Sequence, residues 1–209
     1  MTAERVLDAG HVDDALRLTA ALRHLADTAV RSRPGAHTAA AAAQIEAIVA
    51  ELEEHTVDEV LPWSYALDPE QKQLLIRLTG GDRSNSAGRA WSSFNPIAPP
   101  VDMVMDGEEH VGRVALGPAF TGPPGRVHGG TVATLLDHAM GALLFHLGRP
   151  SFTARLEIDY LAAAPLGAPL DLRANVERID GRKSHVRATI SVDGEVAARG
   201  SGLFLTMAK

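Results

Sequence analysis

One strongly apolar stretch, residues 131–147, limits the folds that this chain can adopt. It is long enough for a buried helix of about five turns, since an α-helix has 3.6 residues per turn. Two consecutive glycines, Gly129 and Gly130, stand directly before it, and a single carboxylate, Asp137, lies inside it. The domain therefore has to be built around one central helix, because a helix of this composition must be covered by other elements.

Strand-like runs flank that helix on both sides. Two precede it, at 101–105 and 110–116, and four follow it, at 151–161, 170–179, 184–192 and 195–206. Asp-Gly pairs at 106–107, 180–181 and 193–194 mark tight hairpin turns. The pattern predicts an α+β domain in which an antiparallel sheet wraps around the central helix.

The first half of the chain has a different character. Apolar residues at helical spacing predict helices over 12–30 and 37–55, with a short third helix over 69–78. Residues 80–88 are rich in Gly, Ser and Asn and are typical of a linker. The prolines of Asn95-Pro-Ile-Ala-Pro-Pro predict a stiff extended segment. We therefore divide the chain into a helical extension with linker, 1–90, and a domain over 91–209.

Composition excludes several classes of protein. The 209 residues contain no cysteine, which excludes a disulfide framework and a thiolate metal site. Residues 1–90 hold nine Lys and Arg against fourteen Asp and Glu, so a nucleic-acid partner is not expected. Neither a signal core nor an unbroken membrane span is evident, so we expect no membrane partner and a cytoplasmic protein.

The glycine pair and the carboxylate are the chemical candidates. Asp137 has no Lys or Arg near it in sequence, and a buried unpaired charge is costly. A glycine pair at a helix start leaves backbone N–H groups that can stabilise an anion. The two features are eight residues apart, about 12 Å along a helix, so one carbonyl group cannot touch both. Either only one of them is functional, or a second copy of the helix completes the site across a two-fold axis; we favour the second arrangement.

These residues resemble a known family. His128-Gly-Gly with Asp137 nine positions after the histidine, the approach Gly122-Pro-Pro-Gly-Arg-Val, and the segment 95–100 together resemble the hotdog-fold acyl-CoA thioesterases. The closer likeness is to the branch with phenylacetate-pathway and mammalian thioesterase-superfamily members, and it covers about residues 91–209. The resemblance implies hydrolysis of acyl-CoA thioesters by a homodimer or dimer of dimers. No cofactor is implied, since CoA is part of the substrate.

The resemblance also implies a role for individual residues. The Gly129 backbone N–H polarises the thioester carbonyl, and Asp137 acts as general base or nucleophile, a choice that the sequence leaves open. Thr153 falls at the position that orients the water or the carboxylate, and His128 is expected to shape the loop. Some branches carry Asn six positions before the histidine, where this chain has Gly122.

Residues for the CoA moiety are less specific. We take Gly130, Arg155, Arg182 and Lys183 as the candidates, with Arg149 beside them, although surface arginines are common in any protein. His138 and His146 lie about two helical turns apart and have no clear third ligand, so no metal site is predicted.

Other interpretations remain open. Asp137 could be satisfied by Thr153 or a helix cap without a catalytic role, the glycines could serve close packing, and Thr153 could be a simple β former. A non-enzymatic acyl-CoA sensor would use the helical extension to contact a partner. A hotdog hydratase or dehydratase commonly has a His five positions after the Asp, where this chain has Ala142.

Overall fold

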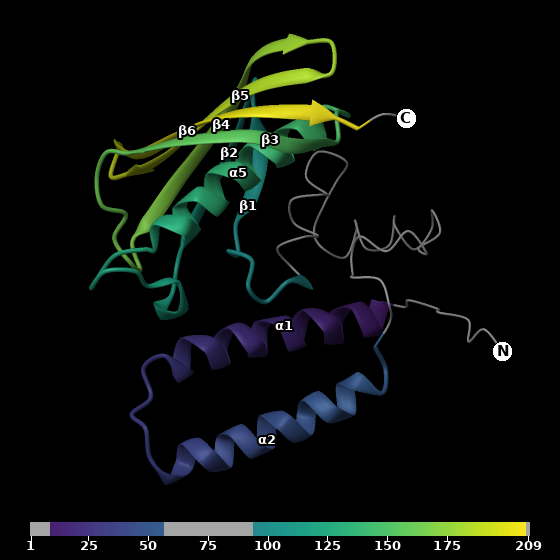
Figure 1. The fold of residues 1–209 in the computed structure, drawn as a ribbon, viewed down its shortest axis with the longest axis vertical. Coiled ribbons are helices and arrows are strands. Elements are labelled where there is room, and N and C mark those ends of the chain that lie inside the picture. Colours follow the sequence, from purple (N-terminus) through teal and green to yellow (C-terminus); the bar gives the residue numbers. More distant parts are fainter. Residues whose placement is uncertain (1–8, 57–93, 208–209) are drawn as a thin grey trace, which may run out of the picture.

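The structure is a computed structural model, and it describes residues 9–56 and 94–207. Helices α1 (Ala9–Ala29) and α2 (Ala36–Glu53) run antiparallel at one side of a sheet domain (Figure 1). Both agree with the helices predicted over 12–30 and 37–55. The helix predicted at 69–78 and the linker at 80–88 lie outside the described residues.

The domain is a six-stranded antiparallel sheet. Its strands are β1 (Asp102–Asp106), β2 (Glu109–Ala115), β3 (Ser151–Tyr160), β4 (Pro169–Asp180), β5 (Lys183–Val192) and β6 (Glu195–Thr206). They lie in the order β1-β2-β4-β5-β6-β3, so β1 and β3 are the two edges. Gly107, Gly181 and Gly194 have φ of 63°, 55° and 86°, the left-handed conformation that makes glycine the natural residue in each Asp-Gly turn.

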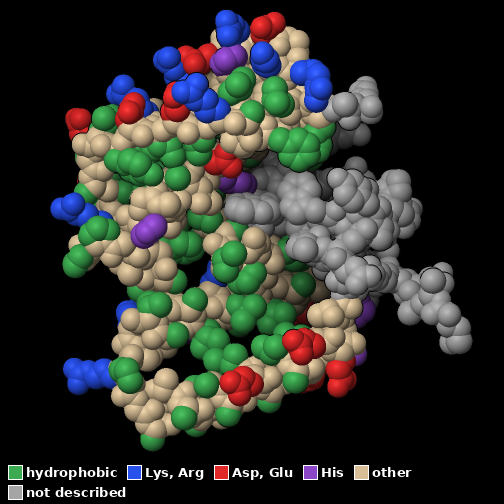
Figure 2. Space-filling model, viewed as in Figure 1, with side chains coloured by type: hydrophobic (Ala, Val, Ile, Leu, Met, Phe, Trp, Pro, Cys, Tyr) green, Lys and Arg blue, Asp and Glu red, His purple; other side chains and the backbone are tan. Residues whose placement is uncertain are grey.

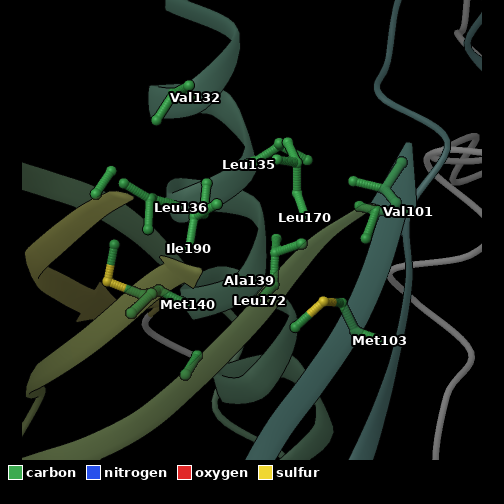
Figure 3. Close-up of a cluster of buried hydrophobic side chains, with 14 of the residues drawn as sticks. Val101, Met103, Val132, Leu135, Leu136, Ala139, Met140, Leu170, Leu172 and Ile190 are labelled. Carbon is green, nitrogen blue, oxygen red and sulfur yellow. The ribbon is translucent and has the colours of Figure 1, made fainter. Parts of the chain in front are cut away.

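Helix α5 (Gly129–His146) lies against the sheet and fills its curve, as the sequence predicts (Figure 1). Its inner face packs against side chains of the sheet in one continuous core (Figure 3). The helix contributes Val132, Leu135, Leu136, Ala139, Met140, Leu143 and Leu144 to this core. Gly202 of β6 lets the helix approach closely, since a Cβ there would stand 3.1 Å from the Met140 sulfur and 2.4 Å from the Phe204 ring.

Helix α1 docks on the domain through one face. Val12 is buried beside Phe94. Arg23 donates to the carbonyl oxygens of Asn95, at 2.9 Å, and Ala98, at 3.3 Å. The segment 95–98 is a turn closed by the Ala98 N–H and the Asn95 oxygen at 3.1 Å, so the expectation of a fully extended segment is wrong there. The Asn95 side chain stabilises the turn by accepting a hydrogen bond from the Ile97 N–H. The prolines at 96 and 99 are compatible with this turn, because neither of their nitrogens is needed as a donor.

Helix α2 contributes no buried residue. The sequence predicts α1 from three leucines at helical spacing, Leu18, Leu22 and Leu25. These side chains are 38–39% exposed and do not lie on the face of α1 that contacts the sheet domain. Apolar side chains of the two helices line a hollow between them (Figure 2). Within residues 9–56 and 94–207, no helix combines the length and the apolarity needed to cross a membrane.

Candidate active site

The first turn of α5 leaves one backbone donor available. His128 is the N-cap residue, and its ring Nδ1 accepts from the Gly130 N–H at 3.0 Å. The His128 carbonyl accepts from the N–H groups of Thr131 and Val132 at 2.9 and 3.1 Å. Within the described part of the chain, the Gly129 N–H makes no hydrogen bond. An anion or a polarised carbonyl at this tip would therefore be bound by the Gly129 N–H, with the positive end of the helix dipole behind it.

Packing inside the protomer does not explain the glycine at 129. A Cβ there would lie 3.6 Å from the nearest Tyr160 atom, which is ordinary van der Waals contact, and φ at 129 is not positive. At Gly130 a Cβ would press on the His128 ring at 3.1 Å, so this glycine does allow the cap. Close packing of the helix against the sheet therefore explains neither glycine: Gly129 has room for a Cβ, and Gly130 leaves room for the His128 ring that caps the helix.

Gly122 also has a local reason. A Cβ at 122 would stand 2.8 Å from the His128 Cα, because the loop from Thr121 to Val127 folds back on itself through an isolated antiparallel bridge. An Asn at this position, as in some relatives, would need a different loop path. In this chain the loop backbone passes close to His128 at a position that has no side chain.

Asp137 and Thr153 meet as the sequence predicts. The Thr153 hydroxyl donates to Asp137 Oδ1 at 2.8 Å. The contact depends on a β-bulge in β3, since the pairing with β6 shifts register between Thr153 and Arg155. The bulge changes the alternation, so that Thr153 lies on the same side of the strand as the inward-facing Leu156 and Ile158, toward α5.

The environment of Asp137 differs from expectation. The carboxylate is only half-buried in the protomer and has a hydroxyl partner, so the expected buried, unpaired charge is wrong for a single chain. The reason is that Asp137 lies on the flank of α5, away from the stripe that faces the sheet. Gly129 and Asp137 are separated by eight residues of one continuous helix, about 12 Å. One protomer does not place both groups on one carbonyl.

The basic candidates lie apart from the helix tip. Arg182 donates to the Thr206 carbonyl at 3.0 Å, and Arg149 donates to the Gly181 carbonyl at 2.8 Å. These residues and Lys183 surround the β4–β5 turn beside the C-terminal end of α5, where Lys and Arg side chains gather (Figure 2). Arg155 pairs with Glu157 on β3. The structure therefore groups Arg149, Arg182 and Lys183 and leaves Arg155 and Gly130 separate from them.

The helix histidines belong to a different cluster. His110 of β2 is 2% exposed, and its ring stacks on that of His146 with centroids 6.3 Å apart. Burial lowers the pKa of His138 to about 4, and the charge of nearby His110 adds to the shift. Within the described residues, no three His, Cys, Asp or Glu side chains are placed to hold a metal ion.

Sequence reasoning missed Tyr160 at the end of β3. Its hydroxyl donates to the Gly129 carbonyl at 3.0 Å, so it contacts the helix tip directly. Nothing in the sequence signals this contact, because it depends on how the end of a strand lies against the start of a helix 31 residues earlier.

A sheet wrapped around a central helix is the arrangement of the hotdog fold. Comparison with known proteins agrees. Residues 124–198 match the family model described as the thioesterase superfamily. A crystal structure described as a thioesterase superfamily protein is 31% identical, covers 91% of this chain and 94% of its own, and superimposes with a TM-score of 0.72. The chain belongs to the hotdog-fold thioesterase superfamily.

Two curated relatives match part of the chain. Acyl-coenzyme A thioesterase THEM4 of Xenopus laevis is 43% identical over 67 residues, which cover 32% of this chain and 30% of that protein. Acyl-coenzyme A thioesterase THEM5 of Mus musculus is 33% identical over 93 residues, which cover 44% of this chain and 38% of that protein. The matched segments thus span only about a third of these relatives' own lengths.

Proposed function

We propose that this protein hydrolyses acyl-CoA thioesters to the free acid and CoA. The observation that carries the proposal is that one helix bears both a carboxylate oriented by Thr153 and a tip with a free Gly129 N–H. Membership of the thioesterase superfamily and partial likeness to two acyl-coenzyme A thioesterases support the substrate class. The division into an extension over 1–90 and a catalytic domain over 91–209 is part of the proposal.

In the proposed reaction, the substrate carbonyl accepts a hydrogen bond from the Gly129 N–H. Asp137 takes a proton from a water molecule whose oxygen bonds to the carbonyl carbon, or it attacks that carbon itself to give a mixed anhydride that water then cleaves. The negative charge that develops on the carbonyl oxygen is stabilised by the N–H and the helix dipole. In either route the C–S bond breaks as the tetrahedral intermediate collapses, before any anhydride is hydrolysed, and the CoA thiolate leaves and takes up a proton. Thr153 holds the carboxylate in orientation, and His128 holds the tip.

The separation along α5 leads us to propose a site shared between two protomers, with Gly129 from one and Asp137 from the other. Edge strand β3 supports this arrangement, because it carries Thr153 and its outer border has no neighbouring strand among the described residues. Its exposed apolar residues include Phe152, at 67%, and Tyr160, at 56%, which would suit burial against a second copy. Arg149, Arg155, Arg182 and Lys183, with the Gly130 backbone, are the groups that we propose for the CoA moiety.

The first test is turnover with Asp137→Asn, across short-chain, medium-chain, long-chain and aryl CoA esters. We expect turnover to fall at least about a hundredfold, because the amide can neither accept the proton nor attack. Asp106→Asn is the matched control, since Asn suits the Asp106–Gly107 turn equally well and should leave turnover unchanged. Unchanged activity in Asp137→Asn would contradict the proposal.

A second test addresses the shared site. Gly129→Pro replaces the N–H by a ring carbon, and proline is well accepted at the first position of a helix after an extended residue such as His128. Each variant alone should be inactive. Random mixing of Asp137→Asn and Gly129→Pro protomers should restore about a quarter of wild-type activity, because half of the dimers then contain one intact site. Absence of any recovery would exclude the shared arrangement.

A third measurement separates the two roles of Asp137. Single-turnover hydrolysis in H₂¹⁸O with excess enzyme puts the label directly into the acid product if Asp137 is a base. If Asp137 is the nucleophile and water attacks the Asp137 carbonyl of the anhydride, the first product carries an unlabelled carboxylate oxygen from the protein, and label appears in Asp137. Label in Asp137 therefore identifies the nucleophilic route.

A further inference from the structure

The peptide between Gly129 and Gly130 is held at both of its polar ends by side chains. Its N–H donates to His128 Nδ1 at 3.0 Å, and its carbonyl accepts from the Tyr160 hydroxyl at 3.0 Å. His128 belongs to the helix start itself, whereas Tyr160 belongs to β3, the strand that also carries Thr153. Tyr160 therefore attaches the helix tip to the edge of the sheet.

This attachment matters because of the glycine pair. Glycine loses more backbone freedom on ordering than any other residue, so two in succession at a helix start favour fraying. A donor stabilises a developing oxyanion best when it is already oriented before the reaction. The Gly129 N–H lies one peptide bond before the group that Tyr160 holds, so its direction depends on that peptide staying in the helical position.

The aromatic ring adds a second contact. Tyr160 Cε1 lies 3.6 Å from the position of a Cβ on Gly129, so the ring stands alongside the tip without crowding it. Tyr160 pairs with Ala198 of β6 as the last residue of β3, which fixes its backbone. The hydroxyl is thus delivered to the Gly129 carbonyl from an ordered strand.

We propose that Tyr160 is a positioning residue for the Gly129 N–H, acting through its hydrogen bond to the Gly129 carbonyl. This inference rests on the proposed function, since it assigns Tyr160 a part in the same oxyanion contact. Tyr160 and Thr153 then make β3 the strand that orients both catalytic groups of α5: one end holds the helix tip and the other holds Asp137.

The test is Tyr160→Phe, which removes the hydroxyl and keeps the ring. We expect kcat to fall about tenfold with KM within about twofold, a smaller loss than removal of an oxyanion donor itself because the N–H is still present. Ser151→Ala is the matched control: Ser151 is on the same strand and donates to a backbone carbonyl, that of Arg149, at 2.7 Å, away from the tip. It should change kcat less than twofold.

A binding measurement separates positioning from general structure. S-(2-oxoheptyl)-CoA has a ketone near the place of the thioester carbonyl, and S-heptyl-CoA lacks it. The wild-type protein should bind the ketone more tightly than S-heptyl-CoA. In Tyr160→Phe the ratio of these two affinities should fall about tenfold, with the affinity for S-heptyl-CoA unchanged. Thermal unfolding of Tyr160→Phe and of the control Ser151→Ala verifies that both variants keep the fold.

The outcomes distinguish the two proposals. Wild-type protein with no thioester turnover and no preference for the ketone would overturn the proposed function. The role of Tyr160 alone would be overturned if the wild-type protein is active and Tyr160→Phe keeps the same kcat and the same preference for the ketone. A change in Tyr160→Phe that is confined to KM would also overturn it.

Discussion

His128 influences the site through the nitrogen that caps the helix. Because Nδ1 accepts from the Gly130 N–H, the proton of the neutral ring is on Nε2. A ring in this state has no free nitrogen with which to accept a proton, so it is unsuited to act as a general base. Its backbone N–H is also fixed, by the Phe120 carbonyl at 2.9 Å. The expected loop-shaping role of His128 therefore has a definite physical form, the N-cap of α5.

Two substitutions at 128 test this role. His128→Ala should lower the free energy of unfolding by about 1 kcal/mol, the usual cost of losing an N-cap acceptor. His128→Asn should recover most of that stability, since the Asn oxygen can cap the same helix, and should keep most of the turnover. Denaturant unfolding and kcat together provide the measurement. Equal loss of turnover in both variants, with stability recovered in Asn, would indicate chemistry at the ring instead.

Elements form where the sequence carries a repeating signal. The strands and α5 could be predicted because alternation, Asp-Gly turns and a long apolar run are local properties. The resemblance to the family predicts the contact between Asp137 and Thr153. It does not predict the β-bulge that makes the contact possible, since the register shift depends on how β3 pairs with β6. Tyr160 could not be predicted for the same reason, since its contact joins segments distant in sequence. The turn at 95–98 is different, because it is closed by local hydrogen bonds and an Asn before a proline is a turn signal that the sequence carries.

Three histidines lie where helix α5 packs on strand β2 and have no direct part in the proposed chemistry: His110 is buried, and His138 and His146 are half-buried. His110 and His146 stack, and burial lowers the pKa of His110 as it does that of His138. The backbone carbonyl of Ala139, 3.5 Å from His110 Nδ1, partly opposes the shift. The native packing of α5 on β2 therefore favours the neutral rings of His110 and His138.

This packing predicts acid sensitivity. The pKa of His138 is about 4 in the folded protein against 6.5 for an ordinary histidine, so between these values the unfolded chain binds the extra proton. The contribution of His138 to the free energy of unfolding is therefore fully present above about pH 6.5. It is lost as the pH decreases, and the loss at pH 4 is about 3 kcal/mol.

Urea unfolding at several pH values measures the effect. His138→Leu should flatten the dependence between pH 6.5 and 4, because the substituted side chain does not titrate. His24→Gln, at an exposed position of α1, is the control and should leave the dependence as in the wild-type protein. Identical pH profiles for wild type and His138→Leu would show that His138 is not responsible.

Across the whole molecule, the extension and the site are joined by a short series of contacts. Asp27 of α1 accepts from the Ala119 N–H at 2.8 Å and so caps the 3-10 helix η1 (Pro118–Phe120). The last residue of η1, Phe120, accepts the His128 N–H. Two hydrogen bonds therefore connect the surface of α1 to His128, the N-cap of α5. We expect the extension to stabilise the loop that leads to the site.

A double-mutant cycle tests this connection. A Cβ at Gly117 would stand 2.3 Å from Asp27 Oδ2, so Gly117→Ala should displace the carboxylate and cost about 1 kcal/mol of unfolding free energy, as should Asp27→Ala. In the Asp27→Ala background, Gly117→Ala should cost almost nothing. Additive losses in the double variant would mean that the two positions act independently.

The glycine at 117 has a consequence beyond this one chain. Its backbone is extended, with φ of −78°, a conformation open to every amino acid, so the carboxylate on α1 is the constraint that the structure places on its size. Homologous sequences can therefore be sorted at this position: a bulky residue aligned with 117 marks a protein that has no carboxylate at the position of Asp27, or whose amino-terminal helix packs elsewhere.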